Sequence, residues 1–227
     1  MTLSTIFSGY LLAVAGAAAG IAALRLDKRV ARLTIAGLAL WLAYATAMGT
    51  TGLAGRTDIL PRGIALLAGP VVAAILLITL TRPGAVLAAH IPIAVLLGFQ
   101  TFRVGVELTL NHLAGQGLAP RIMTLAGGNI EILVAATAPL AAWLVGRGPT
   151  GRKVAWGWNL IGLLSLGNVV TRAVLSAPGP LQLIHAEVPD QAILLFPFTF
   201  IPGFMAPLAL ALHILAFRAL RATRFAD

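Results

Sequence analysis

The sequence predicts an all-α integral membrane protein: a bundle of seven transmembrane helices, with the N-terminus outside and the C-terminus in the cytoplasm. Of its 227 residues, 59% are hydrophobic and 10% are charged, a composition far from that of water-soluble globular domains. Apolar stretches long enough for a hydrocarbon core of about 30 Å recur seven times along the chain. Basic residues gather in alternate connections, which indicates the orientation.

The seven expected spans form a single transmembrane domain over residues 1–227. Helices are expected, because isolated strands without alternating polarity could not satisfy their backbone hydrogen bonds in lipid. The expected helices cover residues 6–24, 33–49, 63–81, 85–111, 129–146, 154–175 and 193–217. The outer connection 176–191 is rich in proline, which favours a fixed path. It is expected either to cap the bundle or to serve as a plain connector.

The distribution of positive charge supports this topology. With the N-terminus outside, eleven basic residues fall on the inner side and five on the outer side, as the positive-inside rule requires. The first basic residue, Arg25, follows the first apolar run, so the basic segment of a cleavable signal peptide is missing and the run is expected to stay as a helix. We expect the protein to lie in a bacterial inner membrane, in direct contact with the lipid bilayer.

Several classes of function are excluded by composition and motifs. The net charge of +9 does not indicate nucleic acid, because the basic residues sit at the ends of apolar runs. The absence of cysteine removes disulfides, thiolate metal sites and iron–sulfur clusters. The last expected span has no lysine for a retinal Schiff base. Phosphate-binding glycine loops, nucleophile elbows and dinucleotide fingerprints are also absent from the sequence.

Polar residues within the expected spans collect toward the outer ends of the fourth, fifth and sixth helices. A charge at membrane depth costs roughly 2.5 to 3.5 kcal/mol, so such residues normally face a partner or a wet cavity. Helical spacing places those of the fourth and sixth helices in one stripe each. The residues expected to line one outward-facing pocket are Gln100, Arg103, Glu107, Asn111, Asn129, Glu131, Asn168 and Arg172.

This pocket predicts binding or transport of a small polar or anionic solute, or of protons. Arg103 and Arg172 are the expected anion partners, and Glu107 and Glu131 are the expected protonatable groups. A purely structural interpretation competes with this one. In that interpretation Arg103 pairs with Glu107, and Arg172 pairs with Glu131 or a carbonyl, and the pairs tie the bundle together.

Three further alternatives stay open at this point. A membrane-embedded enzyme could use Glu107 or Glu131 with His112 or His185 as an acid–base or zinc-binding set. A b-type haem could lie between His90 and His213, which the helical rise places at matching depths. The chain could also be an accessory subunit of a membrane complex. No motif identifies a cofactor, a catalytic set or a protein partner.

Overall fold

The computed structural model describes residues 2–56, 58, 63–177 and 182–222, and these residues form helices and their connections with no strand among them. Six helical segments are long and apolar enough to cross a membrane, by length and composition. The all-helical prediction is therefore confirmed. The six segments are Leu3–Arg25 (α1), Lys28–Thr50 (α2), Gly63–Leu80 (α3), Ile93–Gly115, Gly148–Ser176 (α8) and Ile201–Ala222.

Shorter elements subdivide or join these segments. The segment Ile93–Gly115 consists of two α-helices joined by a short 3-10 helix (a 3-10 turn). The segment Ile201–Ala222 is a single turn of π-helix (the π turn) followed by an α-helix. One apolar helix, α7, has 14 residues and is shorter than the six. The remaining bounds are α4 Arg82–His90, α5 Ile93–Gly98, α6 Arg103–Gly115, α7 Glu131–Leu144, α9 Ala206–Ala222, the 3-10 turns Leu53–Gly55, Phe99–Phe102, Arg121–Met123, Leu125–Gly127 and Ala192–Leu194, and the π turn Ile201–Met205.

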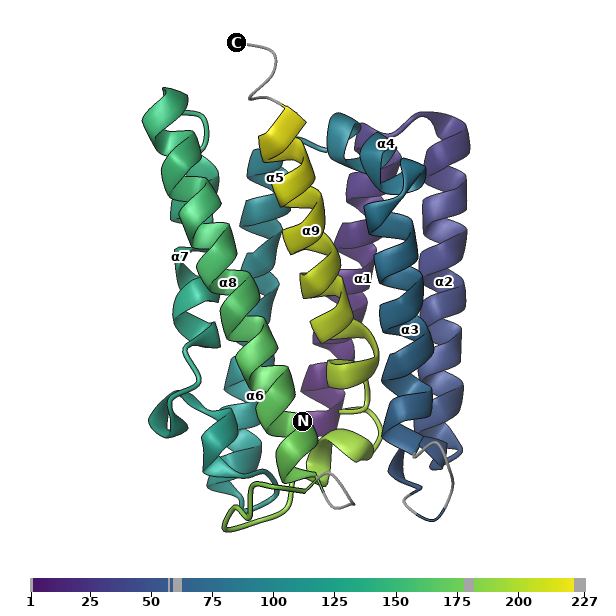
Figure 1. Ribbon diagram of the computed structural model, residues 1–227. Helices are drawn as coiled ribbons and strands as arrows, with labels where there is room; N and C mark the ends of the chain where they lie inside the picture. The colour runs from purple at the N-terminus through teal and green to yellow at the C-terminus, as the bar shows by residue number, and fades with distance from the viewer. Residues whose placement is uncertain (1, 57, 59–62, 178–181, 223–227) are drawn as a thin grey trace.

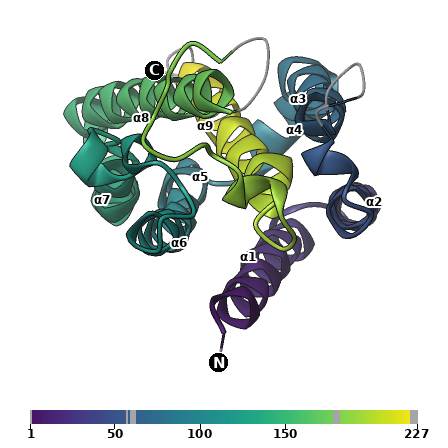
Figure 2. The same cartoon turned by 90° about the horizontal axis from the view of Figure 1, so that it is seen from below.

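The helices run between two ends of one bundle, with α9 in its middle (Figures 1 and 2). α9 packs against α3 and α4 on one side and against α5 and α8 on the other. α1 begins at the lower end of the bundle in Figure 1, and α9 finishes at the upper end. The outer faces of the bundle carry large exposed apolar side chains, among them Leu12, Leu24, Leu40 and Leu77. A surface of this kind suits contact with lipid chains.

The predicted fourth helix over residues 85–111 is interrupted, so that prediction was wrong in its first part. α4 ends at His90, Ile91 adopts an extended conformation, and α5 begins after Pro92. Proline has no N–H to donate and disfavours a helical conformation in the residue before it. The membrane-length segment therefore starts at Ile93, and α4 is a separate short helix.

The predicted seventh helix over residues 193–217 begins later than expected. A 3-10 turn covers Ala192–Leu194, and regular α-helix starts only at Ala206 and continues to Ala222. Between them Pro197 and Pro202 each remove a backbone donor, and the π turn lies directly before α9. Irregular backbone of this kind inside a membrane is tolerated where it is buried in protein or lines a cavity.

Two aromatic side chains of α2 satisfy carbonyl groups that prolines leave without a helical donor. In a regular helix, residue 207 would donate to the carbonyl of Gly203, but Pro207 has no N–H. The indole Nε1 of Trp41 donates to this carbonyl at 2.6 Å. In the same way Pro70 cannot donate to the carbonyl of Leu66, and the hydroxyl of Tyr44 does so. α2 thereby stabilises α3 and the π turn that precedes α9.

Removing either donor is expected to destabilise the bundle. Trp41→Phe and Tyr44→Phe each keep the aromatic ring but leave one carbonyl without its donor, which should lower the free energy of unfolding by about 1–2 kcal/mol. Thermal unfolding in mild detergent measures the loss. Trp143→Phe is the control, because the Trp143 ring is half-exposed and its contact is with the guanidinium of Arg147, 3.9 Å from the ring centre. Equal stability of all three variants and the native protein would contradict this account.

Candidate functional site

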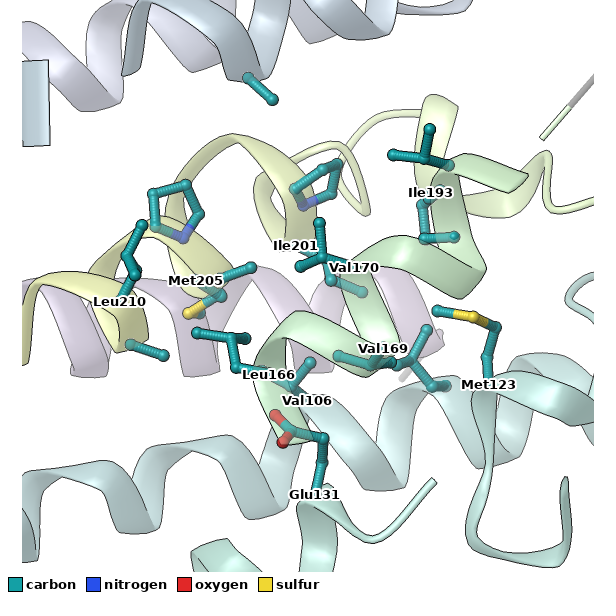
Figure 3. Close-up of a pocket in the computed structure, with 18 of the residues that line it drawn as sticks. Val106, Met123, Glu131, Leu166, Val169, Val170, Ile193, Ile201, Met205 and Leu210 are labelled. Carbon is teal, nitrogen blue, oxygen red and sulfur yellow. The ribbon is translucent and has the colours of Figure 1, made fainter. Parts of the chain in front are cut away.

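A cavity of about 640 Å³ lies between α3, α6, α8 and the start of α9, within the size range of small-molecule sites. Most of its wall is apolar, as the side chains in Figure 3 show. Three ionisable residues, Arg103, Glu107 and Glu131, belong to the same wall. Charged groups in so apolar a wall require partners.

Arg103 and Glu131 supply one such partnership. The Nη2 atom of Arg103, the first residue of α6, forms an ion pair with Oε2 of Glu131, the first residue of α7. Arg103 and Glu131 are only 3% and 2% exposed, respectively. Glu131 also lies in the first turn of its helix, where the helix dipole stabilises a negative charge. The pair joins α6 to α7 through two residues that lie 28 positions apart in sequence.

Asn129 connects the second carboxylate to this pair. Its Nδ2 donates to Oε2 of Glu107 at 2.9 Å and to the carbonyl of Met123 at 2.9 Å. Its Oδ1 accepts from the backbone N–H of Glu131 at 3.1 Å, which satisfies one of the free donors at the helix start. Gly128, with φ of +85°, makes the turn that brings Asn129 into the bundle. Asn129 itself is fully buried.

His213 extends the hydrogen-bonded chain to α8 and α9. Nη1 of Arg103 donates to Nε2 of His213 at 3.0 Å. A guanidinium can only donate, so Nε2 is the acceptor and the proton of the neutral ring lies on Nδ1. Nδ1–H then donates to Oδ1 of Asn159 at 2.8 Å, while Nδ2 of Asn159 donates to the carbonyl of His213 at 3.0 Å. The polar network thus comprises Arg103, Glu107, Asn129, Glu131, Asn159 and His213.

The polar network lies near the middle of the bundle. Arg103 is roughly 15 Å from the start of the segment Ile93–Gly115 by the helical rise. Its partner His213 is likewise well inside Ile201–Ala222. Figure 1 shows α7 beside the upper part of α8, with the irregular connection 116–130 below it. The sequence expectation of a cluster near the outer end rested on a helix starting at residue 85, and the break at Pro92 moves Arg103 inward.

A family model described as a domain of unknown function, DUF8737, matches residues 60–221. The chain belongs to this family. The matched residues run from before α3 almost to the end of α9 and contain every member of the polar network, whereas α1 and α2 lie outside them. No curated protein matches the chain, and no solved structure matches it.

Four of the eight residues predicted for one pocket come together in the polar network: Arg103, Glu107, Asn129 and Glu131. The other four do not. Nε2 of Gln100 donates to the carbonyl of Ala209 at 3.1 Å inside the bundle. Asn111 and Asn168 are exposed.

Arg172 has a role in the connection between α6 and α7. Its Nη1 donates to the carbonyls of Ile122 and Gly127 at 3.1 and 2.8 Å, and its Nε donates to Oδ1 of Asn168 at 3.3 Å. These contacts tie the connection to α8. This is the carbonyl pairing of the structural interpretation, and it leaves Arg103 as the one cavity-lining arginine of the described chain.

The pairing predicted for Arg103 is also different. The structural interpretation joined Arg103 to Glu107, whereas the ion pair is made with Glu131. Asn159 and His213 were not assigned to the site from sequence. The available signal was a single amide in an apolar stretch of α8 and a histidine in the last span, both fully buried in the structure. Buried polar groups are almost always hydrogen-bonded to one another or to the backbone.

The histidine-based alternatives gain no support from the geometry. His90 is exposed at the end of α4 and bonds the carbonyl of Val86, while both ring nitrogens of His213 are engaged by Arg103 and Asn159. His112 and His185 are exposed, unlike the buried Glu107 and Glu131. Within the described ranges no group of three or more histidine, aspartate and glutamate side chains is placed to hold a metal ion.

The described part of the connection after α8 is attached to the rest of the bundle and contributes to the cavity wall. Residues 178–181 of the predicted cap 176–191 lie outside the described residues, and the rest makes two attachments. The N–H groups of Leu183 and Ile184 donate to the carbonyl of Leu175, at 3.0 and 2.9 Å. Oε1 of Glu187 accepts from the N–H of Arg121 at 2.6 Å, which lowers the pKa of Glu187. The flanks of the connection line the cavity at Ala177, Ile193 and Leu194.

Proposed function

We propose that this protein is a seven-span inner-membrane protein that binds a small molecule. Glu131 and Glu107 bind the polar group of that molecule and exchange protons. The cavity beside the polar network is the proposed binding site. Movement of the bound molecule or of protons across the bilayer is the proposed role.

The proposed seventh span is α7 together with the connection 116–130 that leads into it. α7 alone is roughly 21 Å long, less than a hydrocarbon core of about 30 Å. The connection contains two 3-10 turns and the buried residues Met123, Thr124 and Asn129, so it fills the remaining depth inside the protein. An odd number of spans agrees with a first helix and a last helix that start and finish at opposite ends (Figure 1). The excess of basic residues on one side favours an outer N-terminus and a cytoplasmic C-terminus.

The observation that carries the binding proposal is the free oxygen of Glu131. Its Oε1 is buried and has no hydrogen-bond partner among the described residues. Figure 3 shows the Glu131 carboxylate directed into the cavity, toward Val106 and Leu166. A buried acceptor without a donor is costly. A ligand that donates a hydrogen bond, or a proton on the carboxyl group, relieves this cost.

The charges of the cavity wall define the polar group further. Two carboxylates face one guanidinium, and Arg103 already forms an ion pair with Glu131 and donates a hydrogen bond to His213. An anionic ligand would add negative charge where positive charge is already lacking. An ammonium group or a proton would balance the excess negative charge, and a hydroxyl would donate a hydrogen bond to it. Of the polar solute, anionic solute and protons expected from the sequence, these charges therefore favour a polar solute that donates a hydrogen bond, or a cation such as a proton, over an anion.

The position of the site favours a transport role. Transporters commonly place substrate and ion sites near the bilayer midplane, where broken helices expose their ends. Irregular segments line this cavity, among them the 3-10 turn ending at Phe102 and the π turn containing Ile201, and α7 begins beside it at Glu131. Ionisable residues at such depth mark ligand or proton pathways in membrane proteins.

Glu131→Gln tests the binding proposal. The substitution keeps the shape and an oxygen acceptor for Arg103 but removes the charge, so a bound molecule should lose at least about tenfold in occupancy. Native mass spectrometry of the protein released from mild detergent measures that occupancy. Glu187→Gln, the same change at an exposed carboxylate outside the cavity, should keep it. Native protein without a bound mass, or equal occupancy in all three proteins, would refute the proposal.

A further inference from the structure

We infer that the bound molecule is an amphiphile, with a hydrogen-bond-donating head at Glu131 and a hydrocarbon tail in the groove between α3 and α8, and that it enters from the bilayer. This inference rests on the proposed function and adds to it the substrate class and the route of entry. Three properties of the cavity support it: the composition of its wall, the position of its mouth and its length.

The cavity wall is apolar apart from the three ionisable residues. The other side chains that line it are aliphatic, aromatic, methionine, proline or glycine. A wholly polar solute would lose its hydration over this surface without finding partners in return, which is unfavourable. Among the described side chains of the wall, the acceptors are the carboxylates of Glu107 and Glu131. The wall therefore matches a molecule with one donating group and a larger apolar part.

The mouth of the cavity lies on the lipid-facing flank of the bundle. α3 packs on α9 and α4, and α8 packs on α7 and α9, so α9 forms the back wall between them (Figure 2). On α8 the lining residues Val170 and Val174 are 43% and 44% exposed, and Gly167 is exposed as well. On α3 the exposed lining residue is Ala65. Apolar residues at such a mouth favour entry from lipid over entry from water.

The length of the groove suits an alkyl chain. Lining residues of α8 extend from Leu163 to Val174, roughly 17 Å by the helical rise, and Ala177, directly after the helix, also lines the cavity. Ile193 and Leu194, from the connection before the π turn, also line the cavity. An alkyl chain that lies along α8 would therefore exchange its lipid contacts for protein contacts, while the polar head group of the same molecule reaches the polar network.

Variants that block the mouth of the cavity test the amphiphile separately from the proposed function. A Cβ added at Gly167 has no neighbouring atom within 4 Å, so a side chain is sterically allowed there, and we expect the ring of Gly167→Phe to extend over the mouth. Gly157→Phe is the matched control, because Gly157 lies on the same helix with equal room and does not line the cavity. Ala68→Phe blocks the same groove from α3. Thermal unfolding checks that each variant folds.

The probes are dodecylamine, dodecan-1-ol, sodium laurate and butylamine, added to nanodiscs at equal mole fraction in the bilayer. Native mass spectrometry of the released protein measures their occupancy. We expect dodecylamine, dodecan-1-ol or both to bind the native protein and Gly157→Phe, and to lose at least about tenfold in Gly167→Phe, Ala68→Phe and Glu131→Gln. Preference for the amine identifies a cationic head, and equal binding identifies a neutral donor.

The contrary outcomes are distinct. Butylamine binding as strongly as dodecylamine, with no effect of either blocking variant but a loss in Glu131→Gln, overturns the amphiphile and leaves the proposed function standing. Laurate binding more strongly than the amine and the alcohol overturns the donating head group. Binding of no probe, or binding that ignores Glu131→Gln, overturns the inference and the proposed function together.

Discussion

Arg103→Met is expected to destabilise the protein by about 3–5 kcal/mol, because it leaves a buried carboxylate without its counter-ion. Oε2 of Glu131 loses its ion-pair partner, and Nε2 of His213 loses its donor. Both groups are enclosed, so water does not replace the lost contacts. Chemical or thermal unfolding in mild detergent measures the change relative to the native protein.

The double variant Arg103→Met with Glu131→Leu is the control for this prediction. Replacing both partners by apolar residues of similar volume removes the charge that the single variant leaves buried, so most of the lost stability should return. Arg172→Met is a second comparison, since this arginine bonds carbonyl groups and leaves no carboxylate behind. Additive losses from Arg103→Met and Glu131→Leu would show that the pair is not coupled.

Asp190→Asn is expected to stabilise the protein at pH 8 and to have little effect at pH 4. Burial raises the pKa of Asp190 from its ordinary value of 3.8 to about 7, and neither carboxylate oxygen has a hydrogen-bond partner among the described residues. Because the folded-state pKa is raised, the unfolded state binds fewer protons between these values, and native stability falls as pH rises through this window. At pH 8 the full cost, up to about 4 kcal/mol, is present, and the neutral amide removes it.

Unfolding measured at pH 4, 6 and 8 checks the sign of this effect. Glu187→Gln is the control of opposite sign, since the N–H of Arg121 lowers the pKa of Glu187. Its stabilising contact is present above its ordinary pKa of 4.5 and is lost as pH falls below it. The Glu187→Gln variant should therefore match the native protein at low pH and be slightly less stable at pH 8. A pH-independent effect of Asp190→Asn would contradict the assigned cause.

The helices were largely predictable because their signals are local. α1, α2 and α3 lie close to the predicted ranges, since an apolar run of membrane length is visible within each segment itself. The starts differ where a capping residue decides them. α2 begins at Lys28 because the Asp27 carboxylate accepts from the N–H groups of Arg29 and Val30.

The site was predictable only in part. The sequence indicated that Arg103, Glu107, Asn129 and Glu131 needed a shared environment, because charges and amides are costly in apolar helices. It could not show which carboxylate pairs with Arg103, since an i, i+4 partner and a partner on the next helix satisfy the same charge. It also could not separate Arg172, which lies at the right helical spacing but binds the connection between α6 and α7.

Local patterns along the chain are enough to assign the class of this protein: a helical chain with membrane-length apolar segments, basic residues at their ends and a few ionisable groups inside them. The depth and connectivity of those groups depend on how the helices pack. The break at Pro92, the short α7 and the crossing of α9 bring Arg103, Glu131 and His213 into contact. Hydrophobic burial depends on composition along the chain, whereas an ion pair depends on the relative position of helices that only packing sets.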